Sequence, residues 1–237
     1  MLAVPEKTAV KFRAVIFDLF GTLVDNMSLK EYEDMMDAMA AVLGAPCDRF
    51  RRAWTGTVDD RMNGAFPTIE ANLLGICLDL GIGPGSGKVS AAAGIRIAVS
   101  GGLIKPRPDA LETLETIRGR GMKTALITDC TPEVPCHVGR SPFASRFDAM
   151  VFSAEVRMKK PDPRIYGIAC AKLAVEPAGC LYVGDGGSGE LTGAGKLGMT
   201  PLRINAQSIE YSLGHKSEAA TWPGPTVRSL KEVLEYC

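Results

Sequence analysis

The feature that most constrains the fold is an alternation of short apolar stretches with helical patterns through the second half of this 237-residue chain. Strands are expected at 12–17, 123–128, 149–153, 180–183 and 201–204. Helices are expected at 109–118, 132–138, 163–173 and 189–197, with a closing helix at 228–236. Apolar strands separated by helices are typical of a parallel sheet buried on both faces. The pattern therefore predicts an α/β fold whose sheet is covered by helices on both sides.

A second region, residues 26–103, contains no convincing strand and has helical periodicity throughout. Its first helix is expected to begin after Ser28, which forms a capping box with Glu31. Further helices are expected at 47–62, 68–80 and 88–99, separated by stretches rich in Gly and Pro. We therefore predict two domains: a core formed by residues 1–25 and 104–237, and an all-helical insertion formed by residues 26–103.

Polar side chains follow the predicted strands at their carboxyl ends. Asp18 follows the first strand and Thr128-Asp129 closes the second, while the fourth ends in Gly184-Asp185, with Glu190 shortly after. The third strand leads toward Lys159 and Lys160. In parallel sheets the chemistry lies beyond the carboxyl ends of the strands, so these groups should converge on one edge.

These residue types suit transfer of an anionic group. Asp18 can be a carboxylate nucleophile that forms a covalent aspartyl intermediate. Backbone N–H groups at Gly21 and Thr22 can face an anion, and the Thr128 hydroxyl can donate to the same group.

The remaining groups balance charge. A lysine beside these carboxylates offsets the negative charge of nucleophile and substrate. Asp185 and Glu190 add hard oxygen ligands of the kind that Mg²⁺ prefers, together with substrate phosphate oxygens.

Four sequence stretches together resemble the motifs of the haloacid dehalogenase (HAD) superfamily, and the resemblance covers nearly the whole chain. The stretches are FDLFGTLVD (17–25), ALITD (125–129), KKPDPRIY (159–166) and YVGDGGSGELTGA (182–194). The resemblance implies a Rossmann-like core, and it makes the insertion a helical cap.

The resemblance also implies roles. Asp18 is the nucleophile, Thr128 holds the transferring group and Lys160 is the charge-balancing lysine. Mg²⁺ is held by Asp18, the backbone carbonyl of Phe20, Asp185 and Glu190.

The chain departs from the usual motifs at two acidic positions. Glu190 stands where an aspartate is more usual, although its longer arm can still reach a metal. Asp129 stands where an asparagine is more usual, and either contacts substrate or only caps its loop. Lys159 is the alternative to Lys160. We prefer Lys160, because the lysine of the superfamily directly precedes the Pro-Asp-Pro turn.

Phe20 is the departure that bears most on function. Phosphatases of the superfamily have an aspartate at this position, which transfers a proton to the leaving group. A phenyl ring cannot do so, and general acid–base help is worth typically a hundredfold to ten-thousandfold. The site therefore favours leaving groups that need no proton, such as those of acyl phosphates and phosphoanhydrides, or else it is a slow phosphatase.

The leading hypothesis is thus a Mg²⁺-dependent hydrolase of phosphatase or phosphotransferase type, acting on a small phosphorylated metabolite through an aspartyl intermediate at Asp18. One alternative is a metal-independent 2-haloacid dehalogenase, since halide leaves unprotonated and dehalogenases of the superfamily resemble this motif with Tyr at the position of Phe20. Asp185 argues against it, because its charge would repel an anionic haloacid. Another alternative is a degenerate HAD-fold binding module.

Substrate selection is expected to come from the cap. Four arginines lie on the helix predicted at 47–62, and one or two could point down at an anionic substrate. Arg51 and Arg52 are the candidates we select, with Arg49 and Arg61 as further possibilities.

The charge balance limits the choice of partners. Lysine plus arginine and aspartate plus glutamate both total 27, so no net field attracts nucleic acid or an anionic membrane surface. We expect a cytoplasmic monomer or homodimer that binds a small anionic molecule, with no nucleic-acid or membrane partner.

Overall fold

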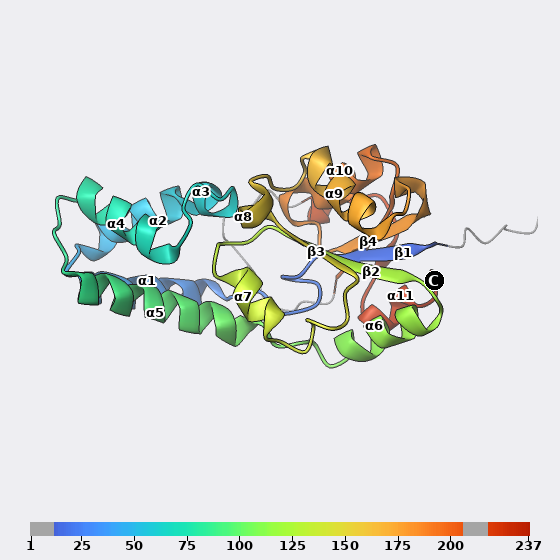
Figure 1. The fold of residues 1–237 in the computed structure, drawn as a ribbon, viewed down its shortest axis with the longest axis horizontal. Helices are drawn as coiled ribbons and strands as arrows, with labels where there is room; N and C mark the ends of the chain where they lie inside the picture. Colours follow the sequence, from blue (N-terminus) through green and yellow to red (C-terminus); the bar gives the residue numbers. More distant parts are fainter. Residues whose placement is uncertain (1–11, 206–217) are drawn as a thin grey trace, which may run out of the picture.

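A six-stranded parallel sheet forms the centre of the protein (Figure 1), whose computed structural model describes residues 12–205 and 218–237. Residues 1–11 and 206–217 of the predicted core lie outside this part. The strands are arranged in the order β3-β2-β1-β4-β5-β6. They are β1 (Ala14–Phe17), β2 (Lys123–Thr128), β3 (Ala149–Phe152), β4 (Cys180–Gly184), β5 (Thr200–Ile204) and β6 (Thr226–Val227). The predicted α/β class with a parallel sheet is confirmed.

Helices cover both faces of the sheet, as predicted. One face packs on α6 (Ala110–Gly119), α7 (Val134–Gly139) and α11 (Leu230–Val233). The other packs on α9 (Pro163–Leu173) and α10 (Glu190–Lys196). Short elements complete the core: α8 (Ser153–Val156) and the 3₁₀ turns η1 (Pro177–Gly179), η2 (Gly187–Gly189) and η3 (Ala219–Thr221).

Five helices lie between β1 and α6 and form a separate layer with its own apolar core (Figure 1). They are α1 (Leu29–Leu43), α2 (Cys47–Gly56), α3 (Val58–Met62), α4 (Ile69–Asp79) and α5 (Ser86–Leu103). The capping box of Ser28 and Glu31 is present at the start of α1. We call this layer the cap. Its treatment as an independent domain, with boundaries at 25/26 and 103/104, stays a prediction.

Several elements differ from the prediction. The short helix α8 was not predicted, and it begins at Ser153, the last residue of the strand expected at 149–153. The helix expected at 47–62 is two helices, because the chain leaves helical geometry at Thr57, whose side chain bonds the carbonyls of Ala53 and Trp54. The short strand β6 was not predicted, and the closing helix spans only 230–233.

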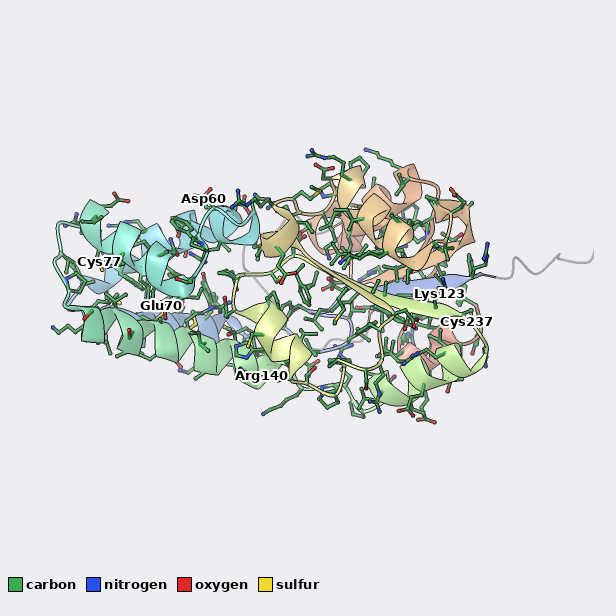
Figure 2. All side chains as sticks on the ribbon, viewed as in Figure 1. Asp60, Glu70, Cys77, Lys123, Arg140 and Cys237 are labelled. Carbon is green, nitrogen blue, oxygen red and sulfur yellow. The ribbon has the colours of Figure 1, made fainter. Side chains whose placement is uncertain are left out.

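The carboxyl ends of the strands face the cap. Lys123, at the start of β2, and Cys237 lie at the end of the molecule far from Glu70 and Cys77 of α4 (Figure 2). Among residues 12–205 and 218–237, no helix is both long enough and apolar enough to cross a membrane.

Candidate active site

The register of three neighbouring strands brings the acidic residues together. Phe17 of β1 lies opposite Leu126 of β2 and Val183 of β4, and the backbone N–H of Asp18 donates to the carbonyl of Val183 at 2.9 Å. The chain therefore leaves β1 at Asp18, beside the points where β2 and β4 end.

Asp18 is buried and held by two side chains. The ammonium of Lys160 donates to its Oδ1 at 2.6 Å, and the hydroxyl of Thr22 donates to its Oδ2 at 3.3 Å. Thr22 is fully buried in the tight turn after β1, where Gly21 has φ +80°. The turn thus fixes the orientation of the carboxylate that we predicted as the nucleophile.

Glu190 is fully buried and all its contacts are internal. Its Oε2 accepts from Lys160 at 2.5 Å and from the Tyr182 hydroxyl at 2.8 Å, while its Oε1 accepts from the backbone N–H of Gly186 at 3.0 Å. Burial and the nearby Glu190 raise the pKa of Tyr182, so its hydroxyl keeps the proton it donates. These contacts make Glu190 an anchor for the lysine.

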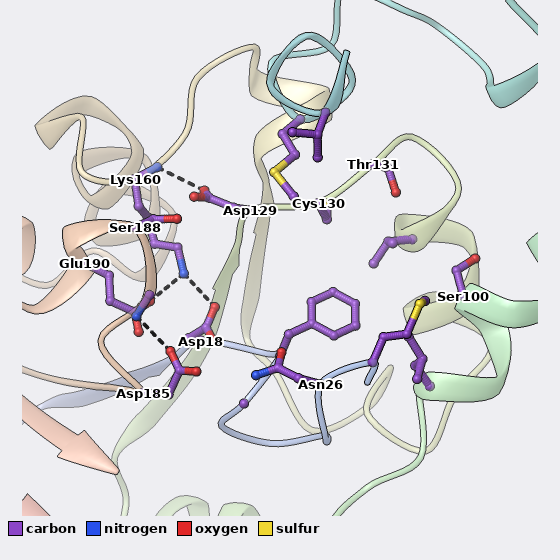
Figure 3. A pocket seen from close by; sticks show the side chains of 18 of the residues that line it. Asp18, Asn26, Ser100, Asp129, Cys130, Thr131, Lys160, Asp185, Ser188 and Glu190 are labelled. Carbon is purple, nitrogen blue, oxygen red and sulfur yellow. Dashed lines mark hydrogen bonds and ion pairs between the residues drawn. The ribbon is translucent and has the colours of Figure 1, made fainter. Parts of the chain in front are cut away.

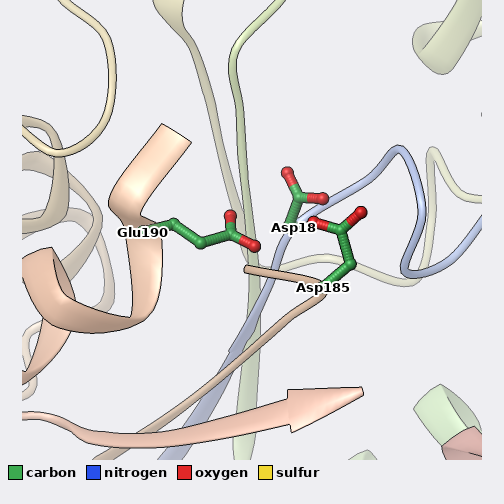
Figure 4. A group of neighbouring side chains, drawn as sticks. All are labelled: Asp18, Asp185 and Glu190. Carbon is green, nitrogen blue, oxygen red and sulfur yellow. The ribbon is translucent and has the colours of Figure 1, made fainter. Parts of the chain in front are cut away.

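Asp185 completes an acidic cluster with Asp18 and Glu190, in which one oxygen of each lies within 4.8 Å of the others (Figure 4). Its Oδ1 accepts from the N–H of Gly187 at 2.8 Å. Its Oδ2 lies so close to Gly21 that a Cβ there would approach it to 2.1 Å. Only glycine leaves room for the Asp185 carboxylate, so Gly21 is needed for this contact as well as for the positive φ of the turn.

The charges of the cluster are strongly coupled. Burial, together with Glu190 and Asp185, raises the pKa of Asp18, and the Lys160 ammonium opposes this shift. Burial and then Glu190 raise the pKa of Asp185 to about 6. Desolvation would lower the pKa of Lys160, but Asp18 and Glu190 outweigh it and raise the pKa, so this lysine stays charged.

The cluster fits a divalent cation on charge. Three carboxylates face one ammonium, and a cation would offset this excess of negative charge. Burial is the main cause of the raised pKa of Asp185, and repulsion from Glu190 adds to it. Asp18 and Asp185 have the donor chemistry for Mg²⁺. Glu190 fits less well as a direct ligand, because both of its oxygens already accept protein hydrogen bonds.

The two lysines of the third motif are separated. Lys160 enters the site, whereas Lys159 turns away and pairs with Asp59 of α3 at 2.5 Å. The carboxylate of Asp129 accepts from the backbone N–H of Lys160 at 2.9 Å (Figure 3). Asp129 therefore fixes the loop that carries the lysine, which is the loop-capping alternative considered from the sequence.

A cavity of about 480 Å³ extends from the acidic cluster to the cap. Phe20, Gly21 and Asp129 line it, whereas the fully buried Thr128 and Thr22 do not, and a role in substrate binding stays a prediction for all of them. The backbone N–H groups of Gly21 and Thr22, which we expected to face an anion, instead donate to the carbonyls of Val24 and Leu19 and close the turn. Trp54 and Met27 also line the cavity.

The two cap arginines that we selected do not line this cavity. Arg51 forms a bidentate pair with Asp37 of α1, and Arg52 is exposed. The helix directs its Phe50 and Trp54 face inward, so both arginines lie on its outer flanks. Arg61, seven positions after Trp54, does line the cavity.

The sequence reasoning also missed three residues at the site. Tyr182 lies within the fourth motif, but nothing showed that its hydroxyl reaches Glu190. Asn26 lines the cavity beside the acidic cluster, and Arg96 lines it from α5 (Figure 3 for Asn26). Arg96 is a lone charge in the apolar run Ile95-Arg96-Ile97, a signal that could have drawn attention to it.

Comparison with known proteins identifies the family. A model of the haloacid dehalogenase-like hydrolases matches residues 12–198, most of the chain. The protein therefore belongs to the haloacid dehalogenase-like hydrolase family.

Individual relatives differ in activity. The chain is 35% identical over 101 residues to an (S)-2-haloacid dehalogenase 4A of Burkholderia cepacia, covering 42% of this chain and 43% of that relative. It is 30% identical over 178 residues to a phosphoglycolate phosphatase 1 of Pseudomonas aeruginosa, covering 73% and 62%. The chain thus spans less than two thirds of the length of either relative.

The fold also matches a solved structure. A 2-haloacid dehalogenase from Pseudomonas syringae pv. Tomato DC3000 superposes with a TM-score of 0.71, at 20% identity, over 95% of this chain and 97% of that one. At this identity the similarity concerns the fold alone.

Proposed function

We propose that this hydrolase is a Mg²⁺-dependent enzyme of phosphatase or phosphotransferase type, which transfers a phosphoryl group from a small metabolite to Asp18. The observation that supports this most is the buried cluster of Asp18, Asp185 and Glu190, which carries more negative charge than Lys160 offsets. An anionic substrate can enter such a site only when further positive charge is present. When bound, Mg²⁺ supplies that charge.

The residues of the chain divide the work. Thr22 orients the Asp18 carboxylate for attack on phosphorus, and Lys160 stands beside the attacking group to neutralise charge on the transferring oxygens. Glu190 and Asp129 hold this lysine from its side chain and its backbone. Attack forms an acyl phosphate on Asp18 and expels the leaving group, and water then releases phosphate.

The half-buried ring of Phe20 lines the cavity where an acid would protonate the leaving group. No proton can come from this side chain, so the preferred substrates are those whose leaving group departs as a stable anion. Acyl phosphates and phosphoanhydrides meet this condition.

A second candidate is dehalogenation of a 2-haloacid without a metal. The apolar ring of Phe20 favours it, because halide needs no proton, and the relatives include haloacid dehalogenases as well as phosphatases. The charge of Asp185 opposes it, since the haloacid is itself an anion.

One panel of assays separates these functions. Acyl phosphates, phosphomonoesters and 2-haloacids are offered to the protein with Mg²⁺ and, separately, in excess EDTA. The proposal predicts phosphate release that EDTA abolishes. Halide release that persists in EDTA would contradict the proposal and identify the protein as a metal-independent dehalogenase. If neither occurs and beryllofluoride forms no adduct at Asp18, the third possibility, a binding module, applies.

A further inference from the structure

The end of the cavity under the cap is lined by basic and aromatic side chains, whereas the end at the sheet is acidic. Arg61 of α3 and Arg96 of α5 both line the end under the cap, with the aromatic side chains of Tyr32 and Trp54. Each of the four comes from a different cap helix: Tyr32 from α1, Trp54 from α2, Arg61 from α3 and Arg96 from α5.

Arg61 is a buried charge without an acidic partner. Its side chain is 1% exposed, and among the described residues no carboxylate lies within ion-pair distance of it. Its Nη1 instead donates to neutral oxygens, the nearest being those of Thr57 at 2.7 Å and Asn72 at 2.8 Å. The guanidinium lies over the ring of Trp54, 3.8 Å from its centroid.

A buried charge of this kind is costly to leave unpaired. Burial lowers the pKa of Arg61 to about 10, and repulsion from Arg96 adds to the shift. Arg96 is compensated, because its Nε lies 2.9 Å from a carboxylate oxygen of Glu133. The three groups together therefore keep one net positive charge, which belongs to Arg61.

Three buried donors at this end also lack acceptors among the residues that the structure describes. They are the hydroxyl of Tyr32, the indole N–H of Trp54 and the Nε–H of Arg61. All three residues are at most 5% exposed. Buried donors are nearly always paired in folded proteins, so three on one cavity indicate that a ligand supplies the acceptors.

We propose that this end of the cavity is a binding site for a carboxylate group of the substrate, held by Arg61, Tyr32 and Trp54. A carboxylate provides about four acceptor positions and one negative charge, which matches the three free donors and the net charge of Arg61. The substrate class that follows is a small carboxylic acid whose reacting group, phosphoryl or halide, extends to Asp18.

The role in substrate choice depends on the proposed function, whereas carboxylate binding can be measured without it. The chain contains two tryptophans, so a Trp222→Phe background leaves Trp54 as the only indole. Its fluorescence reports directly on the site because Trp54 lines the cavity and stacks under Arg61. The titrations use the full chain in EDTA, where no turnover through Mg²⁺ occurs.

Propionate is the probe, and propionamide is its neutral control of the same shape. We expect a saturable change in Trp54 fluorescence with propionate and none with propionamide over the same range. Equal responses to the two would overturn the proposal. Inorganic phosphate is the third titrant: a response as strong as that to propionate, with full competition between them, would assign the site to phosphate and also overturn it.

Tyr32→Phe is the decisive variant, because it removes only a buried hydroxyl whose hydrogen has no acceptor among the described residues. The hydroxyl also interacts with Arg61, so a thermal melt of the variant accompanies the titration. Propionate should bind roughly tenfold more weakly, the effect of one hydrogen bond to a charged acceptor. Arg49→Gln is the matched control, since Arg49 is exposed on α2 and does not line the cavity. Unchanged affinity for propionate in Tyr32→Phe would show that the hydroxyl does not bind the carboxylate, and it would contradict the proposed geometry.

Turnover then separates this inference from the proposed function. Acetyl phosphate and succinyl phosphate differ by a distal carboxylate, and Tyr32→Phe should raise KM for succinyl phosphate while leaving KM for acetyl phosphate unchanged. If propionate binds as expected but neither phosphate nor halide is released from any substrate, the proposed function fails and the carboxylate site stands. If turnover occurs without preference for substrates that have a distal carboxylate, the proposed function stands and the carboxylate site fails.

Discussion

At the scale of single residues, Asp18 determines whether the chemistry is covalent. Asp18→Asn keeps the size of the side chain and removes the nucleophile, so turnover should fall roughly a thousandfold or more. The fold should survive, because the change removes one of three carboxylates in a buried cluster. Steady-state rates and a thermal melt check both points.

The matched control for this variant is Asp34→Asn, which changes an exposed aspartate of α1 that pairs with Lys30. It should alter neither rate nor fold, because exposed ion pairs contribute little. Full activity in Asp18→Asn would exclude the covalent step.

Phe20 should be the residue that limits hydrolysis of phosphomonoesters. Phe20→Asp introduces a proton donor beside the cavity and should raise kcat for a monoester roughly tenfold to a hundredfold, part of the usual value of acid–base help. Phe20→Asn has the same shape without the proton and should give no gain. Equal rates in the two variants would place the limitation elsewhere.

Asp129 should act through the loop of Lys160 and should transfer no proton. Asp129→Asn keeps the oxygen that accepts from the backbone N–H of Lys160. We therefore expect kcat to stay within about threefold of the wild type, given that one neutral hydrogen bond replaces a charged one. A hundredfold loss with an altered pH–rate profile would instead make Asp129 the group that compensates for Phe20, since burial already raises its pKa.

At the scale of elements, most of the sheet could be predicted because its strands are continuous apolar runs between clear turn signals. β6 could not, since Thr226–Val227 is too short to show a period. The break between α2 and α3 was missed because the hydroxyl of Thr57 bonds the preceding turn, a contact that helical periodicity does not reveal.

The junction of β4 and α10 should tolerate no side chain at Gly184. A Cβ there would lie 2.2 Å from Oε1 of Glu190, so Gly184→Ala must displace this carboxylate and with it the Lys160 contact. We expect a loss of about 1–3 kcal/mol in the free energy of unfolding and a large loss of turnover. Denaturant unfolding and steady-state kinetics measure the two effects.

Gly94→Ala is the comparison for that change. Gly94 is exposed in the middle of α5, and a Cβ there would have no described residue within 4 Å. The variant should be more stable by roughly 0.5–1 kcal/mol, because alanine is the better helix former. If both glycines respond alike, the crowding at Gly184 is not what constrains Glu190.

At the scale of the whole molecule, the acidic end of the cavity could be predicted and the basic end could not. The residues of the acidic end follow strands whose order and direction the sequence implies, so their meeting is a property of the sheet. The basic end depends on how α1, α2, α3 and α5 pack together, which placed Arg61 and Arg96 in the cavity and turned Arg51 and Arg52 away.

The excess negative charge of the site should be visible in the stability of the entire protein. In EDTA the pKa of Asp185 is about 6 in the folded state, against about 3.9 for an unfolded aspartate. The folded protein therefore binds more protons between these values, and its free energy of unfolding should fall as pH rises from about 4 to 6, by at most about 3 kcal/mol from this group.

Asp185→Asn lacks this titration, so its stability relative to the wild type should increase over that range and stay constant above it. Added Mg²⁺ at pH 7.5 should shift the difference in stability toward the wild type, because binding at 100 times its Kd stabilises the wild type by about 2.7 kcal/mol and the variant by less. Denaturant titrations measure both effects. Parallel pH curves for the two proteins, together with equal responses to Mg²⁺, would mean that Asp185 has no raised pKa and does not bind the metal.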